Sequence, residues 1–313
     1  MFSWKKLKNP IMTLAPMHDV TDTVFRQIIC LCGKPDVLFT EFICVDGICN
    51  PKSQKKIIEH YFRYSKKEKP IIAQIWGSDP EKFYKSARII KKLGFDGIDI
   101  NMGCPDKTVV KNGGGAALIL NPKLAVKIIK RTKEGAGGLP VSVKTRIGYD
   151  KIITAKWIKE LVKAKPDAII VHGRTKKEMS RVPAHWDEIE KAGKIIKKAG
   201  IISIGNGDVK TLKEAQEKSR KYNLDGIMIG RGALVNPWIF SGKEIEKITP
   251  KERKGLAIKH SVLFEKTFKR VKHFHHLRKH LASYISGFSQ AKEIRSDLMS
   301  AKNTKEVKKI LKP

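Results

Sequence analysis

The sequence predicts a (β/α)8 barrel of the TIM type, followed by a small C-terminal helical domain. Eight short apolar runs, rich in β-branched residues, recur along most of the chain, with helical stretches between them. Such runs are typical of parallel strands buried on both faces. Eight strand–helix units over roughly 240 residues match the usual size of such a barrel. The expected strands are Ile11–Ala15, Val37–Thr40, Ile71–Ile75, Gly97–Ile100, Val141–Lys144, Ala168–Val171, Ile201–Ile204 and Gly226–Ile229.

The expected helices are bounded by residues that favour helix ends. Pro80–Leu93 follows Asp79, a good N-cap, and stops at Gly94, a common C-cap. Pro122–Thr132 follows Asn121 in the same way. A doubly wound open sheet is the alternative, but such sheets usually have fewer strands, and no G-x-G-x-x-G motif follows the first expected strand. The other expected helices are Thr154–Ala164, Asp187–Lys198 and Thr211–Lys221.

The pattern changes near Pro250, after which no strand-like run occurs and apolar residues recur at helical spacing. We therefore expect a barrel domain over residues 1–243 and a helical domain over residues 244–313. From Lys243 onward, 19 Lys and Arg residues stand against seven Asp and Glu residues, together with five of the nine histidines. A basic helical module suits an RNA backbone, and a solvated helical face is the alternative.

The whole chain is strongly basic, with 64 Lys and Arg against 31 Asp and Glu and a formal net charge of +33. Such a surface attracts polyanions, although a lysine-rich proteome would have the same effect. No apolar stretch approaches the ~20 residues of a membrane helix, and the first residues do not resemble a signal peptide. We therefore expect a cytoplasmic protein. The five cysteines are odd in number and poorly spaced for zinc, so we expect neither a disulfide framework nor a metal site.

Polar residues or glycines follow nearly every expected strand, where barrel enzymes place their active sites. The glycine-rich segments 205–208 and 230–233 follow the last two strands, where barrels often bind phosphate, although tight turns would need glycine too. Lys144 ends a buried strand and needs an anion, such as a reduced flavin ring, unless it forms a Schiff base. Gln74 is suited to hydrogen-bond a planar ring edge, and His172 to contact the phosphate or the ring.

Cys104 lies in the segment N-M-G-C-P, just past the fourth expected strand. A free thiol has a pKa of about 8.5 and is mostly protonated at neutral pH, so it can donate a proton to a carbanion-like carbon. A purely structural cysteine is the alternative. The glycine-rich segment 112–117 that follows is expected to be a mobile lid.

Together these ordered motifs resemble the tRNA-dihydrouridine synthases. The match runs from about residue 11 to residue 240, and the segment around Cys104 is its most specific part. The C-terminal segment is similar to that family only in placement and length. The motifs are Ala15–Met17, Thr21-Asp22, Phe25-Arg26, Ala73–Gly77, Asn101–Pro105, Val143–Gly148, His172–Thr175, Gly205–Asp208 and Gly230–Ala233.

The resemblance implies FMN as the cofactor, NADPH as the reductant and tRNA as the partner. Cys104 would protonate C5 of a uracil while hydride passes from flavin N5 to C6, and the base must leave its stack to react. Asn101 and Arg146 look like residues that hold this uracil. His18 departs from the family, which more often has a small residue there. By position, FMN would be held by Pro16, Met17, His18, Gln74, Lys144, His172, Asn206, Gly207, Asp208, Gly230 and Arg231.

Two other interpretations stay open at this point. A small-molecule flavin reductase, such as one similar to dihydroorotate dehydrogenase, would share the barrel, the phosphate loops and the strand-end lysine, but would not need a basic tail. An RNA-binding protein built on a degenerate barrel is the non-enzymatic alternative. The expected site residues are present, which argues against a barrel that has lost its active site. A monomer is the simplest expectation, and the sequence does not indicate which uridine is reduced.

Overall fold

Parallel strands form the centre of the N-terminal part, in a computed structural model that describes residues 2–269 and 271–312. Their order is β1-β9-β8-β7-β6-β5-β4-β2, and the short β3 also pairs with β4. A parallel bridge between Thr13 and Val37 joins the two ends, so the sheet is a nearly closed eight-stranded barrel, as predicted. The strands are β1 (Ile11–Leu14), β2 (Leu38–Phe39), β3 (Ile43–Cys44), β4 (Ile71–Trp76), β5 (Gly97–Met102), β6 (Val141–Gly148), β7 (Ala168–Thr175), β8 (Ile202–Asn206) and β9 (Gly226–Ile229).

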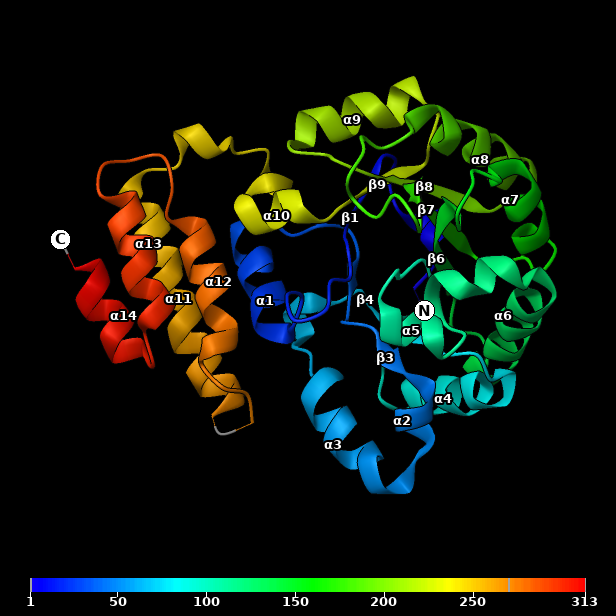
Figure 1. The fold of residues 1–313 in the computed structure, drawn as a ribbon, viewed down its shortest axis with the longest axis horizontal. Coiled ribbons are helices and arrows are strands. Elements are labelled where there is room, and N and C mark those ends of the chain that lie inside the picture. The colour runs from blue at the N-terminus through cyan, green and yellow to red at the C-terminus, as the bar shows by residue number, and fades with distance from the viewer. Residues whose placement is uncertain (1, 270, 313) are drawn as a thin grey trace.

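Helices surround this barrel (Figure 1), and their caps follow the sequence. The Asp79 carboxylate accepts hydrogen bonds from the first turn of α4, and the Asn121 side chain caps α6. None of the helices in the described ranges is long and apolar enough to cross a bilayer. The helices of this part are α1 (Thr23–Cys32), α2 (Val45–Cys49), α3 (Pro51–Tyr61), α4 (Pro80–Lys92), α5 (Lys107–Lys111), α6 (Pro122–Ala136), α7 (Thr154–Val162), α8 (Trp186–Lys198), α9 (Leu212–Lys221) and α10 (Arg231–Val235), with 3-10 turns η1 (Trp4–Lys6), η2 (Lys66–Glu68), η3 (Gly115–Leu120), η4 (Ile239–Ser241) and η5 (Ile245–Lys247).

Strands β4 to β8 all run further than expected, because residues past their expected carboxyl ends still pair with neighbouring strands. β6 continues past Lys144 to Gly148, which pairs with Thr175 at the end of β7. These extensions carry polar side chains to the rim of the barrel. Inside the barrel, a small apolar cluster is buried together with Trp4, whose ring lies 6.3 Å from that of Phe39. The interior is therefore a packed core rather than a pore.

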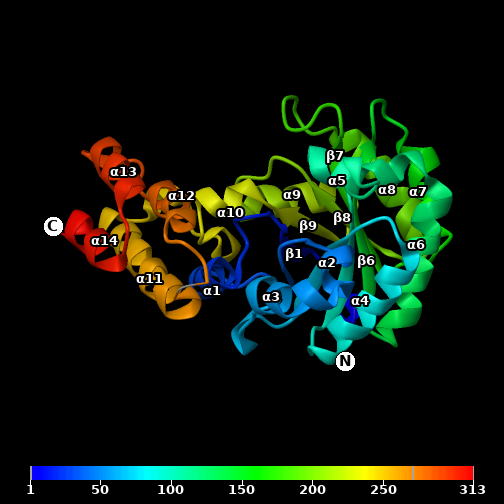
Figure 2. The same ribbon diagram turned by 60° about the horizontal axis from the view of Figure 1, so that its bottom comes forward.

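Four helices form the C-terminal region, and both views show them together on one side of the barrel (Figures 1 and 2). They share one apolar cluster, which also contains Val24 and Ile28 of α1. The expected helical region is thus confirmed. The division at residue 243 stays a prediction, since barrel residues belong to this second core. The helices are α11 (Pro250–Phe268), α12 (His275–Tyr284), α13 (Ala291–Ser300) and α14 (Thr304–Leu311).

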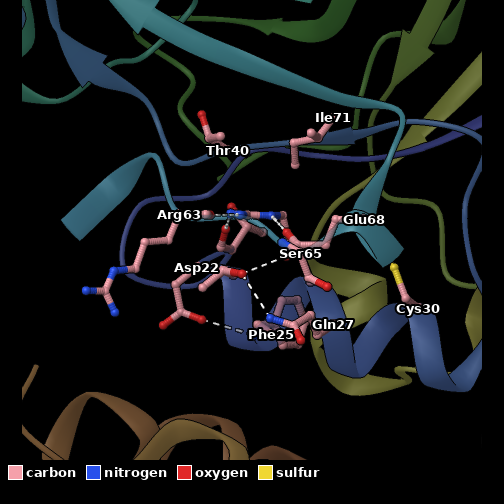
Figure 3. A network of polar contacts seen from close by, with 12 residues as sticks. Asp22, Phe25, Gln27, Cys30, Thr40, Arg63, Ser65, Glu68 and Ile71 are labelled. Atoms are coloured by element: carbon pink, nitrogen blue, oxygen red, sulfur yellow. Dashed lines mark hydrogen bonds and ion pairs between the residues drawn. The ribbon is translucent and has the colours of Figure 1, made fainter. Parts of the chain in front are cut away.

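A buried polar network holds α1 against the chain that leads into β4 (Figure 3). The Glu68 carboxylate accepts a hydrogen bond from Arg26 Nε at 2.6 Å and another from Thr23 Oγ1 at 2.6 Å. Arg26 also donates to the carbonyls of Thr21 at 2.6 Å and Arg63 at 2.8 Å. The pair is fully enclosed, so each charge depends on the other and on these bonds.

A second buried pair joins the barrel to the C-terminal region. Lys272 Nζ lies 2.9 Å from an Asp22 carboxylate oxygen, and the other Asp22 oxygen accepts the Phe25 N–H at the start of α1. Arg63 Nη1 also donates to the carbonyl of Thr267 in α11, at 2.8 Å. The loop after β1 is therefore held by both parts of the molecule.

We expect Glu68→Gln to lower the free energy of unfolding by about 3 kcal/mol, because it leaves the Arg26 charge buried without its counter-ion. Urea unfolding measures the change. Glu160→Gln, at the solvent-accessible pair with Lys163, is the control and should cost less than about 1 kcal/mol. Equal losses in the two variants would contradict the importance of the buried pair.

Candidate active site

A cavity of about 300 Å³ opens at the carboxyl ends of the barrel strands, where barrel enzymes place their sites. Every predicted site residue except His18 lines it, although these residues come from seven different strand ends and loops. The structure brings together Pro16, Met17, Gln74, Asn101, Cys104, Lys144, Arg146, His172, Asn206, Gly207, Asp208, Gly230 and Arg231.

Cys104 lies two residues beyond β5, in a turn that the Asn101 side chain holds. Asn101 Oδ1 accepts hydrogen bonds from the backbone N–H groups of Gly103 at 3.1 Å and Cys104 at 2.9 Å. Burial raises the pKa of the Cys104 thiol, so the thiol is protonated at neutral pH. This position can supply a proton to a ligand in the cavity.

Among the glycines that follow Cys104, Gly115 packs directly against it. The expected mobility of this segment stays a prediction. Gly115 and Ala116 are buried, and the Ala116 N–H donates to the carbonyl of Cys104 at 3.0 Å. A Cβ atom at Gly115 would lie only 2.7 Å from that carbonyl oxygen, and the φ angle there is +56°. Glycine is therefore needed for close approach and a left-handed backbone.

A chain of buried hydrogen bonds runs from the barrel interior to the cysteine turn. Ser142 Oγ donates to Asp99 Oδ1 at 2.5 Å, and Gln74 Nε2 donates to Asp99 Oδ2 at 2.7 Å. Gln74 Oε1 in turn accepts from Asn101 Nδ2 at 3.2 Å. Burial raises the pKa of Asp99 to about 6. Asp99 and Ser142 escaped the sequence reasoning, although a carboxylate within an otherwise apolar strand was an available signal.

Lys144 places a cation deep in the cavity. Its Nζ lies 3.2 Å from Asn206 Oδ1, and Asn206 Nδ2 donates to the carbonyl of Met228 at 2.8 Å. Burial, followed by the charge of Arg146, lowers the pKa of Lys144 to about 8. Within the described ranges no carboxylate forms an ion pair with Lys144. A buried ammonium without a carboxylate partner favours an anionic ligand.

Two arginines flank an aspartate at the phosphate end of the cavity. Arg174 pairs with Asp208, and Arg231 Nη2 lies 2.9 Å from Asp208 Oδ1. Arg174 Nη1 also donates to His172 Nε2 at 3.2 Å, so the neutral imidazole carries its proton on Nδ1. Burial, and then the charge of Lys144, lower the pKa of His172 well below its usual value. Arg174 was not among the predicted site residues, although it lies in the same motif as His172.

Arg146 links the cysteine turn to the loop after β7. Its Nε donates to the carbonyl of Gly103 at 2.7 Å, and its Nη1 donates to those of Thr175 and Met179, both at 3.0 Å. Burial lowers the pKa of Arg146 to about 10. These bonds use the Nε and Nη1 donors and leave Nη2 without a hydrogen-bond partner among the residues that the structure describes.

His18 is the one predicted site residue that does not line the cavity. Its ring is half-exposed, lies 5.3 Å from the ring of Phe42, and has Nδ1 at 3.9 Å from Glu41 Oε1. Phe42 does line the cavity and was missed by the sequence reasoning. An aromatic residue just after the second expected strand was the available signal.

The strand order and the buried cationic cavity define an α/β-barrel protein with an enzyme-type site. Residues 13–312 match the family model described as Dihydrouridine synthase (Dus), and the chain belongs to this family. The match confirms the resemblance and extends through the C-terminal helices, where the motifs had not reached.

Two similar proteins carry names of this family. A "Probable tRNA-dihydrouridine synthase" of Staphylococcus aureus (strain COL) is 41% identical over 98% of this chain and 94% of that protein. A "Probable tRNA-dihydrouridine synthase 2" of Bacillus subtilis (strain 168) is 39% identical over 98% of this chain and 95% of that protein. Among solved structures, histamine dehydrogenase from Rhizobium sp. 4-9 is similar with a TM-score of 0.58 at 11% identity, covering 80% of this chain. This chain spans about half (48%) of that enzyme, and the likeness shows the fold alone.

The lowered pKa of Lys144 predicts a pH-dependent stability in protein without a bound anion. The folded pKa of about 8 is below the ~10.4 of an unfolded lysine, so the unfolded state binds more protons between these values. Stability should therefore rise from pH 8 to pH 10, by up to about 1.4 kcal/mol per pH unit from this group. Lys144→Met should lack this rise in urea unfolding, and Lys159→Met, at an exposed position of α7, should keep it. Identical pH profiles for both variants would contradict the assignment.

Proposed function

We propose that this chain is a tRNA-dihydrouridine synthase that reduces the C5–C6 double bond of a uridine in tRNA, with FMN as cofactor and NADPH as reductant. The observation that carries the proposal is a protonated thiol, Cys104, in the same cavity as the buried ammonium of Lys144. Membership of the dihydrouridine synthase family and the names of the relatives support the substrate.

The donor set of the cavity fits FMN. Lys144 suits the anionic edge of a reduced flavin around N1 and O2, and Gln74 suits an edge of the same ring. Arg174 and Arg231 offer guanidinium groups to a phosphate at the loops after β8 and β9. When bound, FMN would supply the hydride that uracil C6 receives.

Cys104 would then hold the proton that uracil C5 needs. Its raised pKa keeps the thiol protonated, and the Asn101 amide fixes the turn that presents it. The Nη2 donors of Arg146 suit a uracil carbonyl. Asn101 contributes chiefly as a positioning residue, because its Oδ1 already accepts two backbone hydrogen bonds. The base must be extruded from its stack to reach this depth.

The C-terminal helices would bind the tRNA backbone, as their charge suggested. Exposed lysines are spread over all four helices. Lys266 is in the last turn of α11 and Lys269 directly follows the helix, close to Thr267, whose carbonyl accepts a hydrogen bond from Arg63 of the barrel part. The expected division into a catalytic domain (1–243) and an RNA-binding domain (244–313), a monomeric state and a cytoplasmic location belong to the same proposal.

Cys104→Ala should retain bound flavin and lose dihydrouridine formation by a factor of about 100 or more, because general acids typically contribute that much. Cys49→Ala is a matched control, since this thiol contacts Lys82 and Ser86 outside the cavity. Flavin absorbance and mass spectrometry of digested tRNA give the two readouts. Activity of Cys104→Ala equal to that of the control would reject the proton-donor role.

Lys266→Gln combined with Lys269→Gln should weaken tRNA binding and lower its salt dependence, by roughly 0.7–0.9 in the log–log slope for each phosphate that is no longer neutralised. Lys156→Gln with Lys159→Gln, exposed on barrel helix α7, is the control of equal charge change. Filter binding at several salt concentrations measures both slopes. Point substitutions are preferable to truncation, which would expose Val24 and Ile28 of α1. Parallel salt plots for the two variants would count against an RNA role for the end of α11.

A further inference from the structure

We propose that four aromatic rings beside the cavity form a stacking subsite for the unpaired bases next to the uridine that enters it. The rings belong to Phe42, His18, Tyr61 and His60, and are called the ring track below. This inference rests on the proposed tRNA substrate, and assigns the residues that would hold the flanking nucleotides.

The ring track runs without a break from the cavity wall to the C-terminal helices. Phe42 lines the cavity, and the His18 ring lies 5.3 Å from it. Tyr61 stacks 6.4 Å from His18 at an interplanar angle of 23°, and His60 lies 4.4 Å from Tyr61. At the far end, the His60 ring is 6.3 Å from Phe268 of α11. Three separate segments of the chain thus place their rings in one row.

The rings are partly accessible, and Tyr61 packs with one side against the barrel core. None of the four is fully buried, and the side chain of His18 is 49% exposed. Tyr61 and His60 end helix α3, which has no fully buried residue along its length. A contiguous row of partly exposed rings next to a ligand cavity suits planar partners. Stacking on bases tolerates any sequence, because every base has a π-face.

The charges around the track favour bases over phosphates at the rings. An Asp19 carboxylate oxygen lies 3.9 Å from His18 Nε2 and would repel a phosphate there. The buried Glu41 accepts the Asp19 N–H at 2.7 Å, which fixes the loop that carries His18. Lys55 and Lys56 are exposed on α3, on the same helix as the two terminal rings. A strand of RNA would thus lay its bases on the rings and its backbone towards these lysines.

The test uses the flavin-loaded protein and tRNA that carries 2-aminopurine on either side of the reduced uridine. Stacking on an aromatic ring should quench this fluorescence for at least one of the two positions. Tyr61→Leu should remove the quenching and weaken tRNA binding on the order of tenfold, as expected for loss of one base–aromatic stack. Tyr61→Phe keeps the ring and should behave like the original protein.

His18→Ser tests the track at a half-exposed position that the fold does not depend on, and His18→Phe is its ring-retaining control. Weakened tRNA binding with normal flavin content in His18→Ser supports the proposal. Loss of flavin with unchanged tRNA binding would mean that His18 serves the cofactor, and would overturn it. Unchanged quenching and affinity in Tyr61→Leu would also overturn the proposal. The rings would then be assigned to contact with a protein partner.

The fluorescence readout needs no turnover, so it separates this proposal from the proposed function. If the original protein quenches the probe but forms no dihydrouridine, the proposed reaction fails while the stacking subsite stands. If it forms dihydrouridine but quenches neither probe, the reaction stands and the ring track is wrong.

Discussion

Two buried ion pairs around α1 are the interaction on which the arrangement of the molecule depends. Arg26 with Glu68 holds the helix to the barrel, and Asp22 with Lys272 holds its first turn to the C-terminal region. A buried charge that loses its partner is costly, so these pairs strongly favour the observed arrangement of the three chain segments. The loop that precedes α1 lines the cavity, so these pairs also help to position that wall of the site.

The cavity combines several cationic side chains with little compensating negative charge. Lys144 and Arg146 both have lowered pKa values because they are buried, and His172 is kept neutral beside them. Such clustering of cations lowers the stability of the folded protein without a ligand. Binding of an anion would offset this cost. This is the pattern expected where a binding site departs from the rules of a stable core.

His18 links the cavity to the surface that would receive RNA. The motif position suggested contact with a cofactor, but His18 does not line the cavity, and its ring lies between those of Phe42 and Tyr61. A small residue at this position would leave that row of rings interrupted.

The sequence by itself determined the strands, the helix caps and the residues at the barrel rim, because periodicity and capping are local and parallel strands bring their carboxyl ends together. Only the tertiary structure decided what each rim residue contacts. The bonds from Asp99 through Gln74 to Asn101, and the pairing of Arg174 with Asp208, join residues far apart in the chain. The position of the His18 side chain was also decided by the tertiary structure. His18 lies in a loop, where no helix or strand periodicity predicts which way a side chain packs.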